Sequence, residues 1–68
     1  MTNKYITIKI TDVKRFISWL DGSTITKVEF LDGKTLRQKE FREYRDFKTG
    51  DKIKALKIGG GKYAGYNF

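Results

Sequence analysis

Residues 17–25 read Ile-Ser-Trp-Leu-Asp-Gly-Ser-Thr-Ile, and residues 28–36 repeat the pattern as Val-Glu-Phe-Leu-Asp-Gly-Lys-Thr-Leu, eleven positions later. Both copies place Asp-Gly between alternating apolar residues. This is one of the strongest short-range signals for a β-hairpin, because glycine adopts positive φ without a Cβ penalty. The repeat therefore predicts a three-stranded antiparallel meander with Gly22 and Gly33 at positive φ.

The segment before the first turn allows two interpretations. Residues 5–10 alternate polar and apolar side chains and predict a strand. Apolar residues at helical spacing over 13–20, with Asp12 as a cap, would also suit a helix. Lys14 and Arg15 at its start and Asp21 at its end have the wrong sign for a helix dipole. Because the second copy of the repeat is a hairpin, we favour a strand over 13–20, either separate from the first strand or its bent continuation.

The length of the turn sets the faces of the meander. A three-residue loop over 31–33 would pair Val28 with Leu36, whereas a two-residue loop of Asp32 and Gly33 would put them on opposite faces. We therefore expect three-residue bulged loops, with Ile17 opposite Ile25 in the first copy. The predicted core face then has Phe16, Leu20, Val28, Phe30 and Leu36, and the other face has Arg15, Ile17, Trp19, Ile25, Lys27, Arg37 and Lys39.

The second half of the chain predicts further short elements. Aromatic residues recur every third position over 41–47, which suits a short helical turn closing the bottom of a barrel. A turn over 48–51 leads into a final hairpin of 52–58 and 62–68 around three glycines. This hairpin would pair Lys57 with Tyr63 and direct inward the side chains of Leu56, Ile58, Ala64 and Tyr66.

The strand count predicts the fold class. Five or six short antiparallel strands in 68 residues favour a small all-β barrel, OB-like or SH3-like, because closure hides strand edges. We expect one domain over residues 1–68, since no linker-like stretch divides the chain. Such barrels host many functions, so the fold alone does not assign one.

The composition limits the chemistry that is expected. The chain has neither histidine nor cysteine, so it lacks the usual general base, the strongest nucleophile and the usual zinc ligands. The pair Glu40 and Glu43 is more typical of surface ion pairs than of acid–base catalysis. We therefore expect no enzyme, no catalytic residue, no metal site and no cofactor.

Net charge is the main functional signal. Fifteen Lys and Arg against eight Asp and Glu give +7, and residues 35–68 alone account for +5 of it. A strongly basic small domain favours a polyanionic partner, although charge also keeps small proteins soluble. The chain shows no membrane-spanning stretch and no apolar signal peptide, so we expect no membrane partner and a cytoplasmic location.

Cations interleaved with aromatic residues predict a non-enzymatic nucleic-acid-binding protein, because lysine and arginine bind phosphates and bases stack on rings. The predicted binding residues are Arg15, Trp19, Lys27, Arg37, Lys39, Lys57, Lys62 and Tyr63. A single strand is favoured over duplex, since no recognition helix is expected. Trp19 could instead belong to the core. The alternative function is an interaction module or inhibitor that docks its basic face on an acidic protein.

Overall fold

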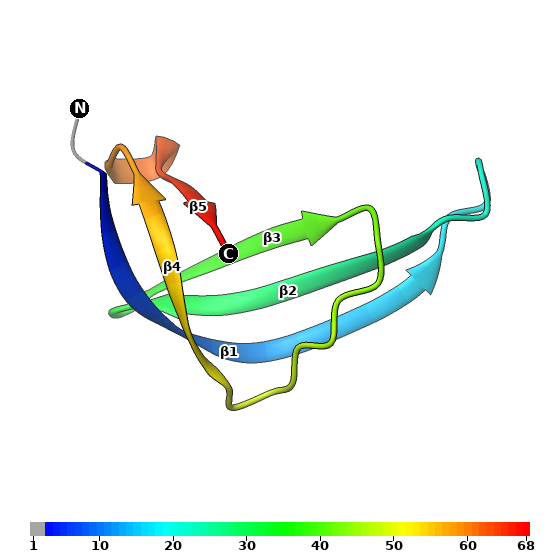
Figure 1. Cartoon of the computed structure of the whole chain (residues 1–68), viewed down its shortest axis with the longest axis horizontal. Coiled ribbons are helices and arrows are strands. Elements are labelled where there is room, and N and C mark those ends of the chain that lie inside the picture. Colours follow the sequence, from blue (N-terminus) through cyan, green and yellow to red (C-terminus); the bar gives the residue numbers. More distant parts are fainter. Residues whose placement is uncertain (1–2) are drawn as a thin grey trace.

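A computed structural model describes residues 3–68 and shows one curled antiparallel sheet (Figure 1). Its elements are β1 (Asn3–Ile17), β2 (Thr24–Asp32), β3 (Thr35–Phe41), β4 (Lys52–Ile58), the 3₁₀ turn η1 (Gly61–Tyr63) and β5 (Gly65–Asn67). The strand order is β3-β2-β1-β4-β5, and the sheet curls into a half-barrel with β3 and β5 as its edges. The predicted all-β fold of five or six short antiparallel strands is confirmed, and the half-barrel is consistent with the predicted small barrel.

Strand β1 is long and bent, and it pairs with two partners. Its first part runs beside β4 from Asn3 to Lys9, and its second part runs beside β2 from Lys9 to Ile17. The ladder to β2 shifts between Ile10 and Asp12, where Thr11 is an extra residue. Such a bulge bends a strand and increases its twist. Residues 13–17 are therefore the bent continuation of the first strand, and the helical interpretation is wrong.

The β2–β3 turn contains two residues, Gly33 and Lys34, with Asp32 opposite Thr35. Gly33 has φ +61°, and no described non-glycine residue has positive φ, as expected for a type II′ hairpin turn. The predicted three-residue loop is wrong, because the tighter turn already matches the right-handed twist of the strands. The positive φ predicted for Gly33 is confirmed.

The β1–β2 turn is a six-residue loop over 18–23. Ile17 lies opposite Thr24, so the predicted pairing of Ile17 with Ile25 is wrong. The amide of Gly22 donates to the carbonyl of Ser18 at 2.8 Å. Gly22 has φ +74°, as predicted, although its loop is longer than a bulged hairpin turn.

The shorter β2–β3 turn changes which residues share a face. Val28 lies opposite Lys39 and Phe30 opposite Arg37, so the predicted separation of apolar and basic faces is wrong. Leu36 lies opposite Leu31 on the outer face and is 55% exposed. The prediction paired Val28 with Leu36, so the observed register is shifted by three residues. Successive side chains of a strand point to opposite faces, so a shift by an odd number of residues moves every side chain of β3 to the other face.

The core fills the concave side of the half-barrel. Phe30 packs edge-to-face against Tyr66 and Phe68, with ring centroids 5.0 and 5.3 Å apart. Phe68 also contacts Phe41 and Phe47, at 5.5 and 5.6 Å. The buried cluster consists of Ile8, Ile10, Val28, Phe30, Phe41, Ala55 and Tyr66.

The β3–β4 connection has no helical turn. From the end of β3 it crosses β2 and β1 to reach β4 (Figure 1). Buried Thr26 donates from its hydroxyl to the carbonyl of Glu43 at 2.8 Å and accepts from the amide of Arg45 at 3.1 Å. These bonds hold the connection in an extended path, so the predicted helical turn is wrong. The predicted turn over 48–51 is confirmed, with Gly50 at φ +95°.

The C-terminal hairpin differs from prediction after β4. The bounds of β4 agree with the expected 52–58, but η1 and the short β5 replace the expected strand over 62–68. Lys57 lies opposite Tyr66 instead of Tyr63. Tyr66 is buried and Ala64 packs on the core as predicted, whereas alternation with inward-facing Lys57 turns Leu56 and Ile58 outward. The predicted inward orientation of these two residues is wrong.

Candidate nucleic-acid interface

Three of the predicted cations, Arg15, Arg37 and Lys39, share the concave face. Arg37 and Lys39 are alternate residues of β3, opposite Phe30 and Val28. Alternate residues of a strand lie about 7 Å apart on one face. Arg15 lies opposite Thr26, which in turn lies opposite Phe41 on β3. The structure thus brings the three cations onto the open side of the half-barrel, and we call them the rim cations.

Arg15 holds the β3–β4 connection in place. Its guanidinium donates to the carbonyl of Arg45 at 2.8 Å from Nη2 and 3.2 Å from Nε, and to the carbonyl of Phe47 at 2.9 Å. It also lies 5.1 Å from the centre of the Tyr44 ring. Carbonyl groups have no net charge, so these bonds orient the guanidinium without neutralising it.

Arg37 makes a similar bond to the C-terminal loop. Its Nη2 donates to the carbonyl of Gly61 at 2.8 Å, and the guanidinium lies 6.0 Å from the Tyr66 ring. The Lys39 ammonium lies 5.3 Å from the ring of Phe41 and 5.9 Å from that of Phe68. Ring faces attract cations but leave their charge intact. Among the described residues, none of the rim cations forms an ion pair.

The β3–β4 connection adds residues to this face that the sequence analysis missed. The Arg45 guanidinium lies 4.7 Å from the centre of the Phe41 ring and bonds Glu43 at 3.4 Å. Tyr44 is exposed beside Arg15. The sequence contains a signal for these residues, because Phe41 and Tyr44 are each followed by an arginine, but the three-residue spacing of the aromatic residues also suits a helical turn.

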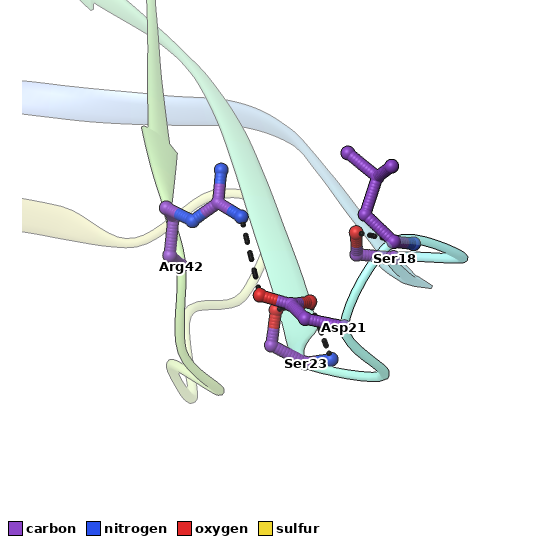
Figure 2. A network of polar contacts seen from close by, with 5 residues as sticks. Ser18, Asp21, Ser23 and Arg42 are labelled. Carbon is purple, nitrogen blue, oxygen red and sulfur yellow. Dashed lines mark hydrogen bonds and ion pairs between the residues drawn. The ribbon is translucent and has the colours of Figure 1, made fainter.

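Trp19 lies in the β1–β2 loop and is 90% exposed, so it is not a core residue. Figure 2 shows the polar network that shapes this loop. Asp21 accepts bonds from the amide and hydroxyl of Ser23 at 3.0 and 2.6 Å, and Arg42 reaches it at 3.4 Å. These bonds lower the pKa of Asp21 to about 2. The loop therefore presents Trp19 to solvent from an ordered turn.

Lys27 lies away from the rim cations. It is on the outer face, opposite Lys14 on β1 and Glu40 on β3. The prediction that it shares a face with Arg37 and Lys39 is wrong, because the two-residue turn reversed the faces of β3 relative to β2. Around Lys27 the outer face has a shallow polar depression lined by Asp12, Lys14, Lys27, Glu29 and Gln38. The depression therefore contains both acidic and basic side chains.

Lys57 is engaged in an internal cluster. Its ammonium donates to Asp32 Oδ2 at 2.6 Å, and the Tyr66 hydroxyl donates to the same oxygen at 2.6 Å. The bonds from Lys57 and Tyr66 lower the pKa of Asp32, and the bond to Asp32 raises the pKa of Lys57. Burial and the bond to Asp32 raise the pKa of Tyr66. Asp32 thus forms an ion pair with Lys57, whereas no described carboxylate forms an ion pair with a rim cation. The charge of Arg37 also contributes to the lowered pKa of Asp32.

The remaining predicted site residues lie in the β4–β5 connection. Tyr63 is exposed in η1 and does not lie opposite Lys57, which corrects the predicted pair. The side chain of Lys62 lies outside the described part of the structure. Elsewhere in the described residues, no group of three or more acidic side chains could hold a metal ion, and no helix is long and apolar enough to cross a bilayer. No family model, curated protein or solved structure matches this chain.

Proposed function

We propose that this protein binds nucleic acid without catalysing a reaction, with single strands favoured over duplex. One observation carries the proposal. Arg15, Arg37 and Lys39 lie on one face beside aromatic rings, and none of them forms an ion pair with a described carboxylate. Such a row of cations suits a phosphate backbone, because attraction to phosphates does not depend on base sequence.

Exposed aromatic residues support a single strand as the ligand. Trp19, Tyr44 and Tyr63 are all exposed. Unpaired bases stack on such rings, at about 1–3 kcal/mol for each base. OB-type barrels hold oligonucleotides with strands 2 and 3 and with the loops that join strands 1–2 and 4–5. Here Trp19 lies in the β1–β2 loop and Tyr63 in the β4–β5 connection.

A titration of backbone amide chemical shifts with a short poly-dT strand tests the proposal. We expect shifts concentrated on β3, on the loop over 18–23 and on residues 44–45. If three to five phosphates are neutralised, the logarithm of affinity should fall with that of salt, at a slope of about −0.7 for each phosphate. A slope near zero would contradict a phosphate-led mechanism.

One observation favours the alternative, a module that binds an acidic protein. The end of β1 and the loop after it expose four large apolar side chains, Phe16, Ile17, Trp19 and Leu20. Exposed apolar clusters mark interaction sites in soluble proteins. Retention on heparin without any oligonucleotide binding at low salt would favour this alternative over nucleic acid.

A further inference from the structure

The outer face of the β1–β4 pair brings three lysines together. Lys9 lies directly opposite Lys52, and Lys54 is two residues farther along β4. Residues directly opposite in an antiparallel pair have Cβ atoms about 5 Å apart, and like charges there are destabilising. The neighbouring Ile8 and Ile10 face the core and are fully buried, so the three exposed lysines point to solvent on the opposite face. We call Lys9, Lys52 and Lys54 the lysine strip.

Nothing described on this face neutralises the lysine strip. Among the described residues, none of its lysines forms an ion pair. The Lys54 ammonium lies 5.7 Å from the centre of the Tyr5 ring, and Tyr5 is 66% exposed. The strip therefore combines three unpaired charges with one accessible aromatic ring.

Two other lysine pairs across β1 differ in this respect. Lys14 lies opposite Lys27, but Glu40 lies opposite Lys27 on its other side. Lys4 lies opposite Lys57, which is bonded to Asp32. Acidic residues thus accompany both of these pairs. The pair of Lys9 and Lys52 has no such carboxylate across the sheet, since Leu31 is the neighbour of Lys9 on β2.

We infer that the lysine strip is a second phosphate-binding surface, which holds the backbone of a nucleic-acid strand while the Tyr5 ring stacks on a base. This inference rests on the proposed function, because the partner is the same nucleic acid. The repulsion between Lys9 and Lys52 destabilises the free protein. Bound phosphates would remove this repulsion, and its removal would contribute favourably to the free energy of binding. Charge complementarity favours an anionic occupant over an apolar protein surface, and the exposed Tyr5 ring beside Lys54 favours a nucleic acid over an acidic protein, because bases stack on such rings.

The location of the strip has a geometric consequence. The rim cations line the concave face, whereas the strip lies on the outer face of the same sheet. One strand that contacts both must pass around an edge of the half-barrel. We therefore expect a strand of about 16 nucleotides to contact both surfaces and a strand of about 4 nucleotides to contact only one. These two lengths are the limits of the range of site sizes of OB-type barrels.

The test compares two doubly substituted proteins of equal net charge. Lys9→Gln with Lys52→Gln removes two charges from the strip, and Lys34→Gln with Lys48→Gln removes two from exposed positions outside the strands. The salt dependence of binding to poly-dT of about 16 nucleotides is measured for both and for the unsubstituted protein. We expect the strip variant to lose about 1.4 from the magnitude of the slope, about 0.7 for each phosphate contact. The control should keep the original slope.

Equal slopes for the two variants would overturn the inference. A failure of the unsubstituted protein to bind any oligonucleotide at low salt would instead overturn the proposed function and, with it, nucleic acid as the occupant. Inorganic polyphosphate separates the two failures. If the strip variant alone loses polyphosphate binding, the anion site stands but nucleic acid is the wrong occupant. If both variants bind polyphosphate equally, the site itself is wrong.

Discussion

Truncation of Trp19 to alanine separates a role in binding from a role in stability. The side chain is 90% exposed in the β1–β2 loop, so its removal uncovers little apolar surface. Surface substitutions away from buried features change the free energy of unfolding by about 0.5 kcal/mol or less. Loss of one stacked base should weaken binding by about 1–3 kcal/mol. This corresponds to a dissociation constant about 5- to 150-fold higher.

Fluorescence provides the assay, because Trp19 is the only tryptophan in the chain. Stacking on a base should quench its emission in the unsubstituted protein. The anisotropy of a labelled poly-dT strand then gives the affinity of Trp19→Ala. Leu20→Ala is the matched control, since Leu20 is the next residue, is 72% exposed and has no ring. The salt slope should be unchanged in both variants, because neither substitution removes a charge.

Two results would refute this reasoning. An affinity of Trp19→Ala equal to that of Leu20→Ala would show that the ring does not stack on a base. A fall in melting temperature of more than about 4–8 °C would indicate a loss of at least 1 kcal/mol of stability, as for a packed residue. That result would contradict the exposed position of Trp19.

Three further predictions concern the rim and the fold. Arg37→Ala should reduce the magnitude of the salt slope by about 0.7, the contribution of one phosphate contact, whereas Arg37→Lys should keep the original slope. Equal slopes for the unsubstituted protein and both variants would exclude Arg37 from phosphate binding. Because bonds from Lys57 and Tyr66 lower the pKa of Asp32 below its ordinary 3.8, the stability that this carboxylate provides is present above about pH 4 and is lost as pH falls through the lowered pKa. Asp32→Asn should therefore lower the melting temperature at pH 7 and weaken its dependence on pH between pH 4 and 2. If the melting temperature of the variant fell with pH as steeply as that of the unsubstituted protein, the stabilising role of the Asp32 cluster would be wrong. Gly33→Val should destabilise the protein by about 1–2 kcal/mol because Gly33 has φ +61°, whereas Gly60→Val, at an extended φ of −157°, should cost less in chemical denaturation; equal costs would argue against strain at Gly33.

Local patterns were sufficient to predict the strands and the class of fold. Alternation over 5–10 and the repeated Asp-Gly pairs depend only on neighbouring residues, and both correspond to observed strands and positive-φ glycines. The register was not predictable in the same way. An Asp-Gly pair does not show whether Asp32 is the last paired residue of β2 or lies inside the turn. The choice shifts the register, and a shift by an odd number of residues exchanges the two faces of the strand. The structure places Asp32 in the ladder, opposite Thr35.

The site could be predicted only in part for the same reason. The common face of Arg37 and Lys39 follows from their spacing of two residues on one strand, whatever the register. The position of Lys57 depends on its bond to Asp32, a residue far away in the chain. The path of residues 42–48 likewise depends on Arg15, which donates to two of their carbonyls. The spacing of residue types along the chain does not show which distant segments contact each other.

The two partners of β1 imply an order of folding. Its second half pairs with β2, which follows it directly, whereas Asn3 pairs with Ile58 near the other end of the chain. Local pairings form faster than distant ones, so we expect the meander to form first and β4 to dock last. Until β4 has been synthesised, the edge of the first half of β1 would remain unpaired, and an unpaired strand edge can form hydrogen bonds with strands of other chains. Lys4 and Lys9 lie on that half, and lysines on an open edge discourage such pairing. The same charges that repel in the finished fold would then protect the unfinished chain from aggregation.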